Sequence, residues 1–428
     1  MTKKALPSGH RLRAVSVLAL TAALTCTVAA HGASGAQAPT APAGSTERAQ
    51  RGHELAGLAQ RAVDAGAPGI VVRVDDGTGP AVEVARQAAW SRADRVLAPG
   101  DRFRMGSNTK TMVATVILQL VAEHRMQLTD PVEKWLPGAV PNGRAITLRM
   151  LLNHTSGLFN HINDPDVLKA FTGQDTRQWT PAELLAAAVR HDPIFPPGTA
   201  YSYSNTNYVA LGLVAEKASG RALSDLIRER IAEPLHLRNT ALPSGASLAG
   251  SRRLAHGYEP DAARIGPLLP PGTPPGTAFA GPARPAGHVD TTRINASTEW
   301  AAGGVVSTAS EWARFDSALL SGKLLASEQL KEMLTTVAEE PGNPNRYGLG
   351  LEQVVTPCGT VWGHVGQVPG YSSWDYTDAT GSRTVSVFAS SVFDLAEPKA
   401  GTAVQTLVNA AVCAMLGKPL PEGSHAAG

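Results

Sequence analysis

Three widely separated segments of the chain carry side chains that could act together on a carbonyl group. In the first, Ser107 precedes Lys110 by one helical turn at the start of an apolar helical pattern, so both project from the same face. A serine hydroxyl is a weak nucleophile until another group accepts its proton, and burial can lower a lysine pKa enough for that task. Alone, the pair decides nothing, because a serine three residues before a lysine is common by chance.

The other two segments add proton-handling and amide groups. Tyr203 and Asn205 lie in a polar loop before a helical pattern, where a tyrosine near a lysine can exchange a proton and an asparagine can both donate and accept. His364 lies at the end of a predicted strand, and Gly366 beside it would let a substrate backbone approach the strand edge. Taken singly, these residues are better explained by a capped helix start with core tyrosines and by a structural histidine.

The elements that must position these side chains follow from hydrophobic periodicity. Helices are predicted over residues 47–65, 107–125, 148–153, 181–189, 208–217, 310–320, 327–334 and 398–416, and strands over 69–75, 81–90, 347–355, 361–364, 372–377 and 384–389. Strands at both ends with helices between them predict an α+β fold with one antiparallel sheet. The N- and C-terminal helices would cover one face and a mostly helical insert the other, with a substrate cleft between sheet and insert.

A proline- and glycine-rich stretch from Gly257 to Asp290 interrupts this pattern. It is too long for an ordinary connection, so we expect either a functional flap or a solvated insertion.

The order and wide spacing of the three segments resemble the serine β-lactamase and D-alanyl-D-alanine carboxypeptidase superfamily, the penicillin-recognising serine hydrolases. That group shares a Ser-x-x-Lys first motif, a Tyr-x-Asn or Ser-x-Asn second motif, and a Lys-Thr-Gly or His-x-Gly third motif. Tyr-Ser-Asn and His-x-Gly indicate its class C-like branch. Supporting matches are Leu151-Leu152-Asn153-His154-Thr155-Ser156-Gly157, Ala302-Gly303-Gly304-Val305-Val306-Ser307-Thr308 and Pro369-Gly370-Tyr371.

The resemblance implies catalytic roles for five residues. Ser107 would be acylated, Lys110 and Tyr203 would move its proton, Asn205 would orient substrate amides, and His364 would replace the third-motif lysine near Tyr203. We therefore expect a serine hydrolase that works through an acyl-enzyme.

The third motif would also bind the substrate. The resemblance implies an oxyanion hole from the backbone N–H groups of Ser107 and Gln367, with Gly366 and Val365 on the same strand. Related carboxypeptidases often have threonine where this chain has Val365 and Gln367, and use those hydroxyls to hold the terminal carboxylate. The strand over residues 351–355 also has no arginine for that carboxylate, so Arg346 or the proline-rich stretch would have to compensate.

Three functions remain open at this point. The first is a D-alanyl-D-alanine carboxypeptidase acting on cell-wall peptides. The second is an esterase, D-amino-acid amidase or class C-like β-lactamase on the same scaffold, which Val365 and Gln367 favour because they remove hydroxyl donors. The third is a binding protein that has lost catalysis. Substrates would be small peptides, β-lactams or esters.

The N-terminus has the three parts of a secretory signal peptide. Basic residues lead into an uncharged apolar run over residues 14–30, and small residues follow up to Ala38. A retained membrane anchor and a lipoprotein through Cys26 are the alternatives. We expect a signal peptide over 1–38, a disordered linker over 39–46, the hydrolase domain over 47–418, a flexible tail over 419–428, and secretion without a stable membrane span.

Cysteine use agrees with export, because removal of the signal leaves only Cys358 and Cys413. An even count in an oxidising compartment favours a disulfide between them over two buried free thiols.

Other features argue against further partners. A net charge of +2, without a basic block beyond the N-terminus, disfavours nucleic acid. His53-Glu54 lacks the second histidine of a zinc-protease helix, so we expect no metal and no cofactor. The chain has no Gly-x-Ser-x-Gly motif, which disfavours an α/β-hydrolase, and His154 is interpreted as structural. The sequence does not indicate an oligomeric state.

Overall fold

The computed structural model describes residues 43–243, 253–339 and 341–419. The predicted signal peptide, residues 39–42 of the predicted linker and all of the predicted tail except Pro419 lie outside these residues. Helix α1 (Ala43–Asp64) begins four residues before its predicted start, so residues 43–46 belong to a helix and not to the linker. These residues include no proline that would stop the helix from extending toward the N-terminus.

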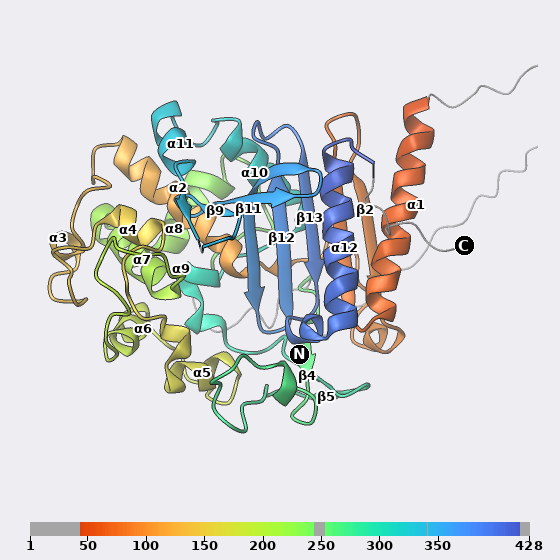
Figure 1. Ribbon diagram of the computed structural model, residues 1–428, viewed down its shortest axis with the longest axis horizontal. Coiled ribbons are helices and arrows are strands. Elements are labelled where there is room, and N and C mark those ends of the chain that lie inside the picture. Colours follow the sequence, from red (N-terminus) through yellow and green to blue (C-terminus); the bar gives the residue numbers. More distant parts are fainter. Residues whose placement is uncertain (1–42, 244–252, 340, 420–428) are drawn as a thin grey trace, which may run out of the picture. The chain divides into compact units, whose positions relative to one another are not determined.

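An eight-stranded antiparallel sheet organises the described residues, with strand order β2-β1-β13-β12-β11-β10-β9-β8 (Figure 1). Its strands are β1 (Gly69–Asp75), β2 (Val82–Gln87), β8 (Val337–Ala338), β9 (Arg346–Tyr347), β10 (Glu352–Thr356), β11 (Gly359–Val368), β12 (Tyr371–Thr377) and β13 (Thr384–Ala389). Because β1 pairs with β13, the two ends of the chain build one sheet, as the sequence predicted.

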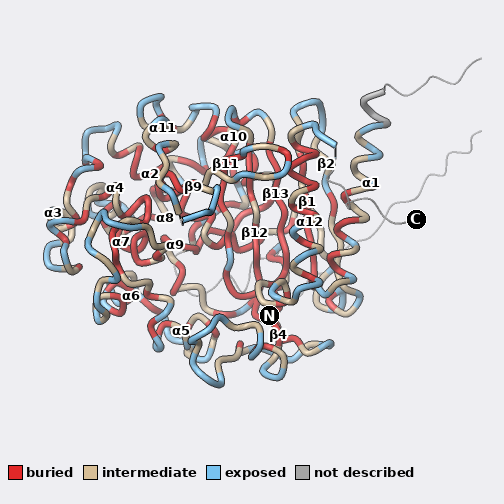
Figure 2. The backbone as a smooth tube through the Cα atoms, viewed as in Figure 1, coloured by how far each residue is buried: buried red, intermediate tan, exposed pale blue. Residues whose placement is uncertain are grey.

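The two faces of the sheet have different cover. On one face, α1 and the last helix, α12 (Pro398–Met415), pack against the strands through a cluster that includes Leu58, Val72 and Leu407. On the other face, α10 (Ala309–Leu320) contacts β12 and β13, and the remaining helices extend from there. Figure 2 shows the buried residues concentrated between these layers. The predicted α+β architecture is therefore confirmed.

Two neighbouring helices, α2 (Thr109–Ala122) and α7 (Asn205–Ser219), are buried along most of their length and form the centre of the helical insert. The helices α9 (Trp300–Gly303) and α8 (Leu223–Ile227) contact both of them, α11 (Ser327–Met333) contacts α2, and α3 (Val132–Trp135), α4 (Leu148–Leu152) and α6 (Pro181–Ala188) contact α7. The insert also includes α5 (Pro165–Phe171). A short pairing of β3 (Phe103–Arg104) with β7 (Val306–Ser307) joins the start of this region to its end.

Three predicted strands differ in extent from the observed ones. The strand expected over residues 81–90 ends at Gln87, and a 3-10 turn (Ala89–Ala93) follows it. Residues 347–355 are not continuous, because Gly350 adopts a positive φ of 77° between β9 and β10, where an added Cβ would lie 2.5 Å from the Ala114 side chain of α2. Conversely, β11 continues four residues beyond the predicted end at His364. His364 therefore lies in the middle of a strand and not at its end.

The proline- and glycine-rich stretch is an anchored structure with its own three-stranded sheet, in the order β4-β6-β5. Its strands are β4 (Tyr258–Pro260), β5 (Ala283–Arg284) and β6 (His288–Asp290). The buried carboxylate of Glu259 accepts hydrogen bonds from the backbone N–H groups of Gly370 (2.6 Å), Val392 (3.0 Å) and Phe393 (2.9 Å). This one side chain therefore connects the stretch to two loops that follow strands of the main sheet.

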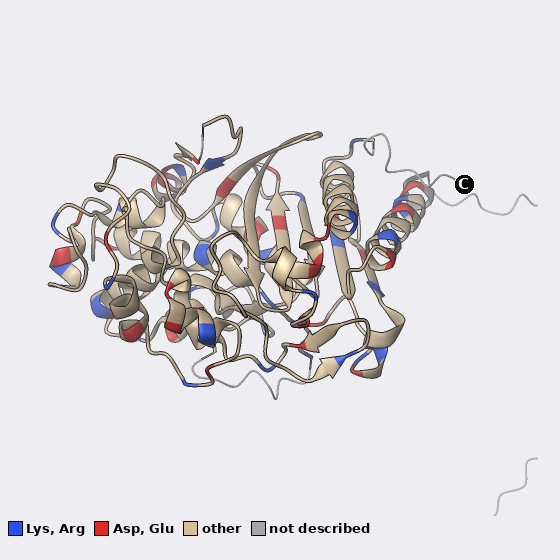
Figure 3. Cartoon of the chain, turned by 60° about the horizontal axis from the view of Figure 1, so that its bottom comes forward, with Lys and Arg blue, Asp and Glu red and all other residues tan. Residues whose placement is uncertain are grey.

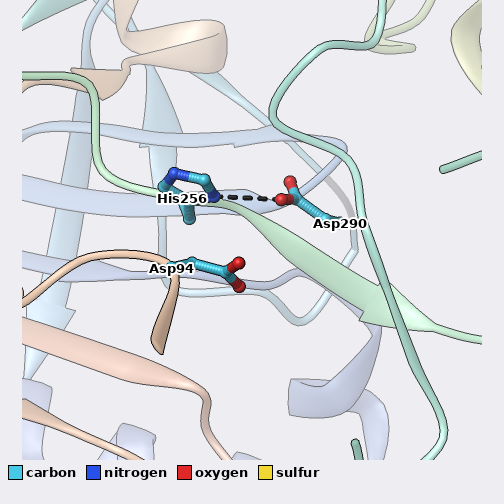
Figure 4. A group of neighbouring side chains, drawn as sticks. All are labelled: Asp94, His256 and Asp290. Carbon is cyan, nitrogen blue, oxygen red and sulfur yellow. Dashed lines mark hydrogen bonds and ion pairs between the residues drawn. The ribbon is translucent and has the colours of Figure 1, made fainter. Parts of the chain in front are cut away.

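A network of charged side chains fastens the same stretch at its base. Asp94, His256 and Asp290 come from three separate segments and lie close enough to hold a metal ion (Figure 4). However, the Arg284 guanidinium already bridges two of them, with 2.7 Å to Asp94 and 3.0 Å to Asp290. His256 Nδ1 donates to Asp290 Oδ2 at 3.0 Å. The chain itself supplies the cation here, so we interpret the group as structural.

A disulfide joins Cys358, in the turn between β10 and β11, to Cys413 of α12, with a Cα–Cα distance of 5.2 Å.

We expect the double variant Cys358→Ser/Cys413→Ser to have a free energy of unfolding about 4 kcal/mol smaller than the wild type, because the cross-link closes a loop of 55 residues in the unfolded chain. Urea denaturation of both proteins measures the difference. A reductant should shift the wild-type midpoint and leave the variant unchanged; equal midpoints without reductant would contradict the prediction.

Charged residues of both signs are intermixed over the described elements, including α1 (Figure 3). None of the helices that the structure describes combines the length and apolarity needed to cross a bilayer.

Candidate active site

The turn that carries Ser107, the predicted nucleophile, lies between α2 and β11, and we refer to it as the nucleophile turn. Ser107 sits in a single 3-10 turn (Gly106–Asn108) that leads directly into α2. Gly106 has a φ of 51°, and a Cβ added there would lie 2.5 Å from the backbone nitrogen of Gln367. The absence of a side chain at Gly106 therefore lets the backbone of the nucleophile turn approach the Gln367 amide of β11.

Lys110 makes three polar contacts from a fully buried position. Its Nζ lies 3.0 Å from Ser107 Oγ, 2.7 Å from Asn205 Oδ1 and 2.7 Å from the carbonyl oxygen of Ala302. The amide and carbonyl oxygens only accept, so two of the N–H bonds of Lys110 point to them. In the neutral amine, the lone pair then points to the Ser107 hydroxyl, which is the arrangement that proton abstraction requires.

The charge state of Lys110 is set mainly by its burial. Burial lowers the pKa of Lys110 to about 7, while the nearby carboxylates of Glu299 and Glu352 oppose that shift by favouring the ammonium form. A substantial fraction of the amine is therefore neutral near pH 7, unlike an exposed lysine with a pKa of about 10.4.

Tyr203 lies beside this pair with its ring 4.8 Å from Lys110 Nζ. Its hydroxyl is buried and has no hydrogen-bond partner of good geometry among the described residues. Burial raises the pKa of Tyr203 well above its usual value, and the neighbouring Ser107 hydroxyl only partly offsets this. The resting phenol is therefore protonated, so Lys110 is the better resting base.

The His154 ring packs against the Tyr203 ring, with ring centroids 4.3 Å apart. The backbone N–H of Ser204 donates to His154 Nδ1 at 3.2 Å. Burial lowers the pKa of His154 well below its usual value, so the ring is neutral. This geometry agrees with the structural interpretation of His154 and explains how the loop before α7 holds Tyr203.

Asn205 begins α7 and lines the cavity beside Ser107. Its backbone N–H donates to Asn160 Oδ1 at 3.1 Å, which fixes the start of the helix, while its side-chain oxygen accepts from Lys110. The structure thus brings Ser107, Lys110, Tyr203 and Asn205 together.

His364 is close to this group but is engaged elsewhere. Its Nδ1 donates to the Val365 carbonyl at 2.6 Å, and its Nε2 lies 2.8 Å from the Tyr347 hydroxyl. Burial lowers the pKa of His364 to about 3, so the ring is neutral and Nε2 accepts from Tyr347. The centroid of the Tyr203 ring lies 6.3 Å from that of His364, with 54° between the two ring planes. Tyr347 lies on β9 and belongs to none of the three motifs, so the sequence did not predict its contact with His364.

Residues on β11 alternate between the two faces of the sheet. The Val365 side chain packs with the cluster under α12, on the face opposite the catalytic group, so its expected contact with substrate is restricted to its backbone. Gln367 is exposed and lines the cavity.

Gly366 has a different role from the one expected. A Cβ there would overlap the carbonyl oxygen of Met105 and lie 2.7 Å from Ser373 Oγ. The missing side chain makes room for the nucleophile turn of this chain and not for a substrate backbone.

Two polar side chains of β12, Ser373 and Asp375, bind the nucleophile turn through Asn108. Asn108 Nδ2 donates to Ser373 Oγ at 2.7 Å and to Asp375 Oδ2 at 3.1 Å, and all three side chains are buried. Burial raises the pKa of Asp375 and of the neighbouring Asp316. Sequence reasoning missed this support, although Asn108 lies inside the first motif.

A cavity of about 560 Å³ opens in front of Ser107. Its walls come from residues after α4, from α5, from the proline-rich stretch and from the loop after β13, and most are apolar. Glu299 is the only charged side chain among the described residues that line it. Arg346, considered above as a carboxylate-binding group, is exposed and instead donates to Thr336.

The fold is that of a serine hydrolase, and the structure groups Ser107, Lys110 and Tyr203 beside the cavity. The Beta-lactamase family model matches residues 55–410, and the chain therefore belongs to the beta-lactamase family. It is 28% identical over 299 residues to PbpX of Bacillus subtilis (strain 168), a protein named for penicillin binding, and the match covers 68% of this chain and 62% of that relative. The chain thus spans less than two thirds of that relative's length.

Two solved structures cover more of the chain. A D-stereospecific amidohydrolase from Streptomyces sp. is 35% identical, with a TM-score of 0.68 over 79% of this chain and 94% of that one. A D-amino acid amidase from Ochrobactrum anthropi SV3, solved with L-phenylalanine, is 25% identical, with a TM-score of 0.72 over 85% of this chain and 98% of that one.

Proposed function

We propose that this serine hydrolase cleaves amides or esters whose acyl group is a D-amino acid. The observation that carries the proposal is the lining of the cavity, where the described residues include a carboxylate but no arginine or lysine. A cavity of that composition has no partner for the terminal carboxylate of a peptide or of a β-lactam. The two similar structures, named as a D-stereospecific amidohydrolase and a D-amino acid amidase, support the same substrate class.

In the proposed reaction, Ser107 Oγ attacks the substrate carbonyl while Lys110 accepts its proton. The tetrahedral oxyanion would be stabilised by the backbone N–H groups of Ser107 and Gln367, whose close approach Gly106 permits. The C–N or C–O bond then breaks, and the leaving group takes a proton relayed through Tyr203. Water adds to the acyl-enzyme by the reverse proton path and releases the free acid. His364 and Tyr347 would position the strand that carries Gln367.

The D-alanyl-D-alanine carboxypeptidase, placed first from the sequence, has less support in this geometry. That reaction needs a group to hold the terminal carboxylate. Val365 has no hydroxyl to donate, Arg346 is directed elsewhere, and the residues of the proline-rich stretch that line the cavity include no arginine or lysine. Both activities would use the same residues to form the acyl-enzyme. They differ in the leaving group, so the residues that contact the leaving group distinguish one activity from the other.

We expect the protein to release ammonia from D-phenylalanine amide, and to release D-alanine from D-phenylalanyl-D-alanine, which has the same acyl group and the same free amine, at least about 100-fold less efficiently, because the carboxylate would be unpaired. Comparison of kcat/KM for the two substrates, with Ser107→Ala as the inactive control, measures the preference. Intact mass after incubation with benzylpenicillin should show no persistent adduct. Efficient D-alanine release together with a stable penicillin adduct on Ser107 would establish the carboxypeptidase instead.

We also propose that the protein is exported. The signal-like N-terminal sequence supports this, as does the disulfide between Cys358 and Cys413, because such bonds persist in oxidising compartments. Determination of the mature N-terminus from the culture medium tests it.

A further inference from the structure

Glu299 is a buried carboxylate without a matching cation. It directly precedes α9, only 7% of the residue is exposed, and its Oε1 has no hydrogen-bond partner among the described residues. Burial raises the pKa of Glu299 to about 7, while Lys110 and Arg104 favour its ionised form. Leaving a buried carboxylate unpaired costs free energy, so a side chain in this state calls for a partner from outside the fold.

The neighbouring cations are already engaged with other acceptors. Lys110 points its N–H groups at Asn205 and Ala302. Arg104 donates through Nη2 to the carbonyl oxygens of Thr292 and Ile294 at 3.0 and 2.9 Å. No ion pair within the described residues therefore satisfies Glu299 directly.

The surroundings of Glu299 indicate what kind of ligand could provide that partner. Glu299 and Ser107 line the same cavity, so a ligand held by Glu299 would also reach the nucleophile. The remaining walls are largely apolar and include the rings of Phe171, Phe279 and Phe393. A ligand that fits this cavity carries one positive group beside a large apolar group.

An α-aminoacyl substrate has this composition. Its ammonium group is two bonds from the carbonyl carbon that Ser107 attacks, and its side chain leaves from the same α-carbon. Glu299 is placed near the reacting group by α9, because Lys110 binds the Ala302 carbonyl of that helix. The carboxylate and the nucleophile are thus linked through a single short helix.

We propose that Glu299 binds the free α-ammonium group of the substrate, and that the apolar cavity accepts a large side chain beside it. This inference rests on the function proposed above and adds to it the residue that makes an unblocked amine necessary. The enzyme would accordingly act on aminoacyl amides and esters with a free N-terminus and discriminate against their N-acylated forms.

The test compares D-phenylalanine p-nitroanilide with its N-acetyl derivative at pH 7. In Glu299→Gln, kcat/KM for the free amine should fall about 10- to 100-fold while that for the acetylated substrate stays near wild type, because a charge-assisted hydrogen bond is lost with only the first. The ratio of the two values cancels any change in Lys110. Glu328→Gln, an exposed carboxylate on α11, is the matched control and should leave both values unchanged.

The remaining outcomes separate the two proposals. An equal fall for both substrates in Glu299→Gln, accompanied by a lower melting temperature, would overturn the ammonium site and assign Glu299 to a water-mediated contact with Arg104, whose Nε also lacks a partner among the described residues. Hydrolysis by the wild type of neither of these substrates nor of D-phenylalanine methyl ester, together with acylation of Ser107 by p-nitrophenyl acetate, would overturn the proposed function itself.

Discussion

Replacing Lys110 by methionine should lower kcat/KM for any accepted ester about 10³- to 10⁴-fold. Methionine fills a similar volume but cannot accept the Ser107 proton, and positioned general bases contribute on this scale. The loss should appear as slow acylation, measured by the release of p-nitrophenol in the first turnover. The prediction depends on the 3.0 Å contact between Lys110 and Ser107 and on the two acceptors that orient the amine.

The same residue should determine the acid limb of the pH profile. The reactive form of Lys110 is the neutral amine, and its pKa is lowered to about 7. The value of kcat/KM for an uncharged ester should therefore rise with pH and reach half of its maximum near pH 7. A profile that is flat from pH 5 to pH 9 would contradict this role, as would loss of activity in Lys217→Met, the control at an exposed helical lysine of α7.

Gly366→Ala is expected to lower activity about 100-fold, because the added methyl group would press against the nucleophile turn. The new Cβ would overlap the Met105 carbonyl and crowd Ser373, both of which hold the nucleophile turn against the sheet. Displacement of a nucleophile by about 1 Å can cost 100-fold in rate. Overpacking of this kind also destabilises by roughly 1–3 kcal/mol. Activity and thermal unfolding of the variant measure the two effects.

The control for this variant is Gly266→Ala. An added Cβ at Gly266 meets no heavy atom within 4 Å, so both activity and melting temperature should stay at the wild-type values. If Gly366→Ala retained more than half of the wild-type activity, the close approach of the turn to β11 would not be needed for catalysis.

The sheet and its helical cover could be predicted because their residues follow simple periods. The strands β1, β12 and β13 are continuous apolar or alternating runs, and their observed bounds agree closely with the expected ones. Where the predicted bounds of a strand differ from the observed ones, contacts between residues far apart in the sequence determine the observed bounds. The break at Gly350 depends on α2, which is distant in sequence, and the continuation of β11 depends on its pairing with β12.

The candidate site was only partly accessible to the same reasoning. Ser107, Lys110, Tyr203 and Asn205 belong to motifs with fixed spacing, and the structure brings them together. Alternation along β11 could have predicted that Val365 faces away from His364, since neighbouring residues of a strand point to opposite faces. Glu299 carries no such signal, because its significance depends on a cavity formed by segments far apart in the sequence.

The attachment of the proline-rich stretch has a consequence for how such enzymes can diversify. Glu259 and the network around Arg284 secure its base, whereas its tip, around Gly272 and Gly276, meets open space. The tip contributes a wall of the cavity but none of the residues that we propose to transfer the proton. Insertions, deletions or grafted loops at the tip could therefore change which acyl groups enter while the catalytic chemistry stays the same. In this scaffold, the residues that select the acyl group can therefore change during evolution independently of the residues that carry out the reaction.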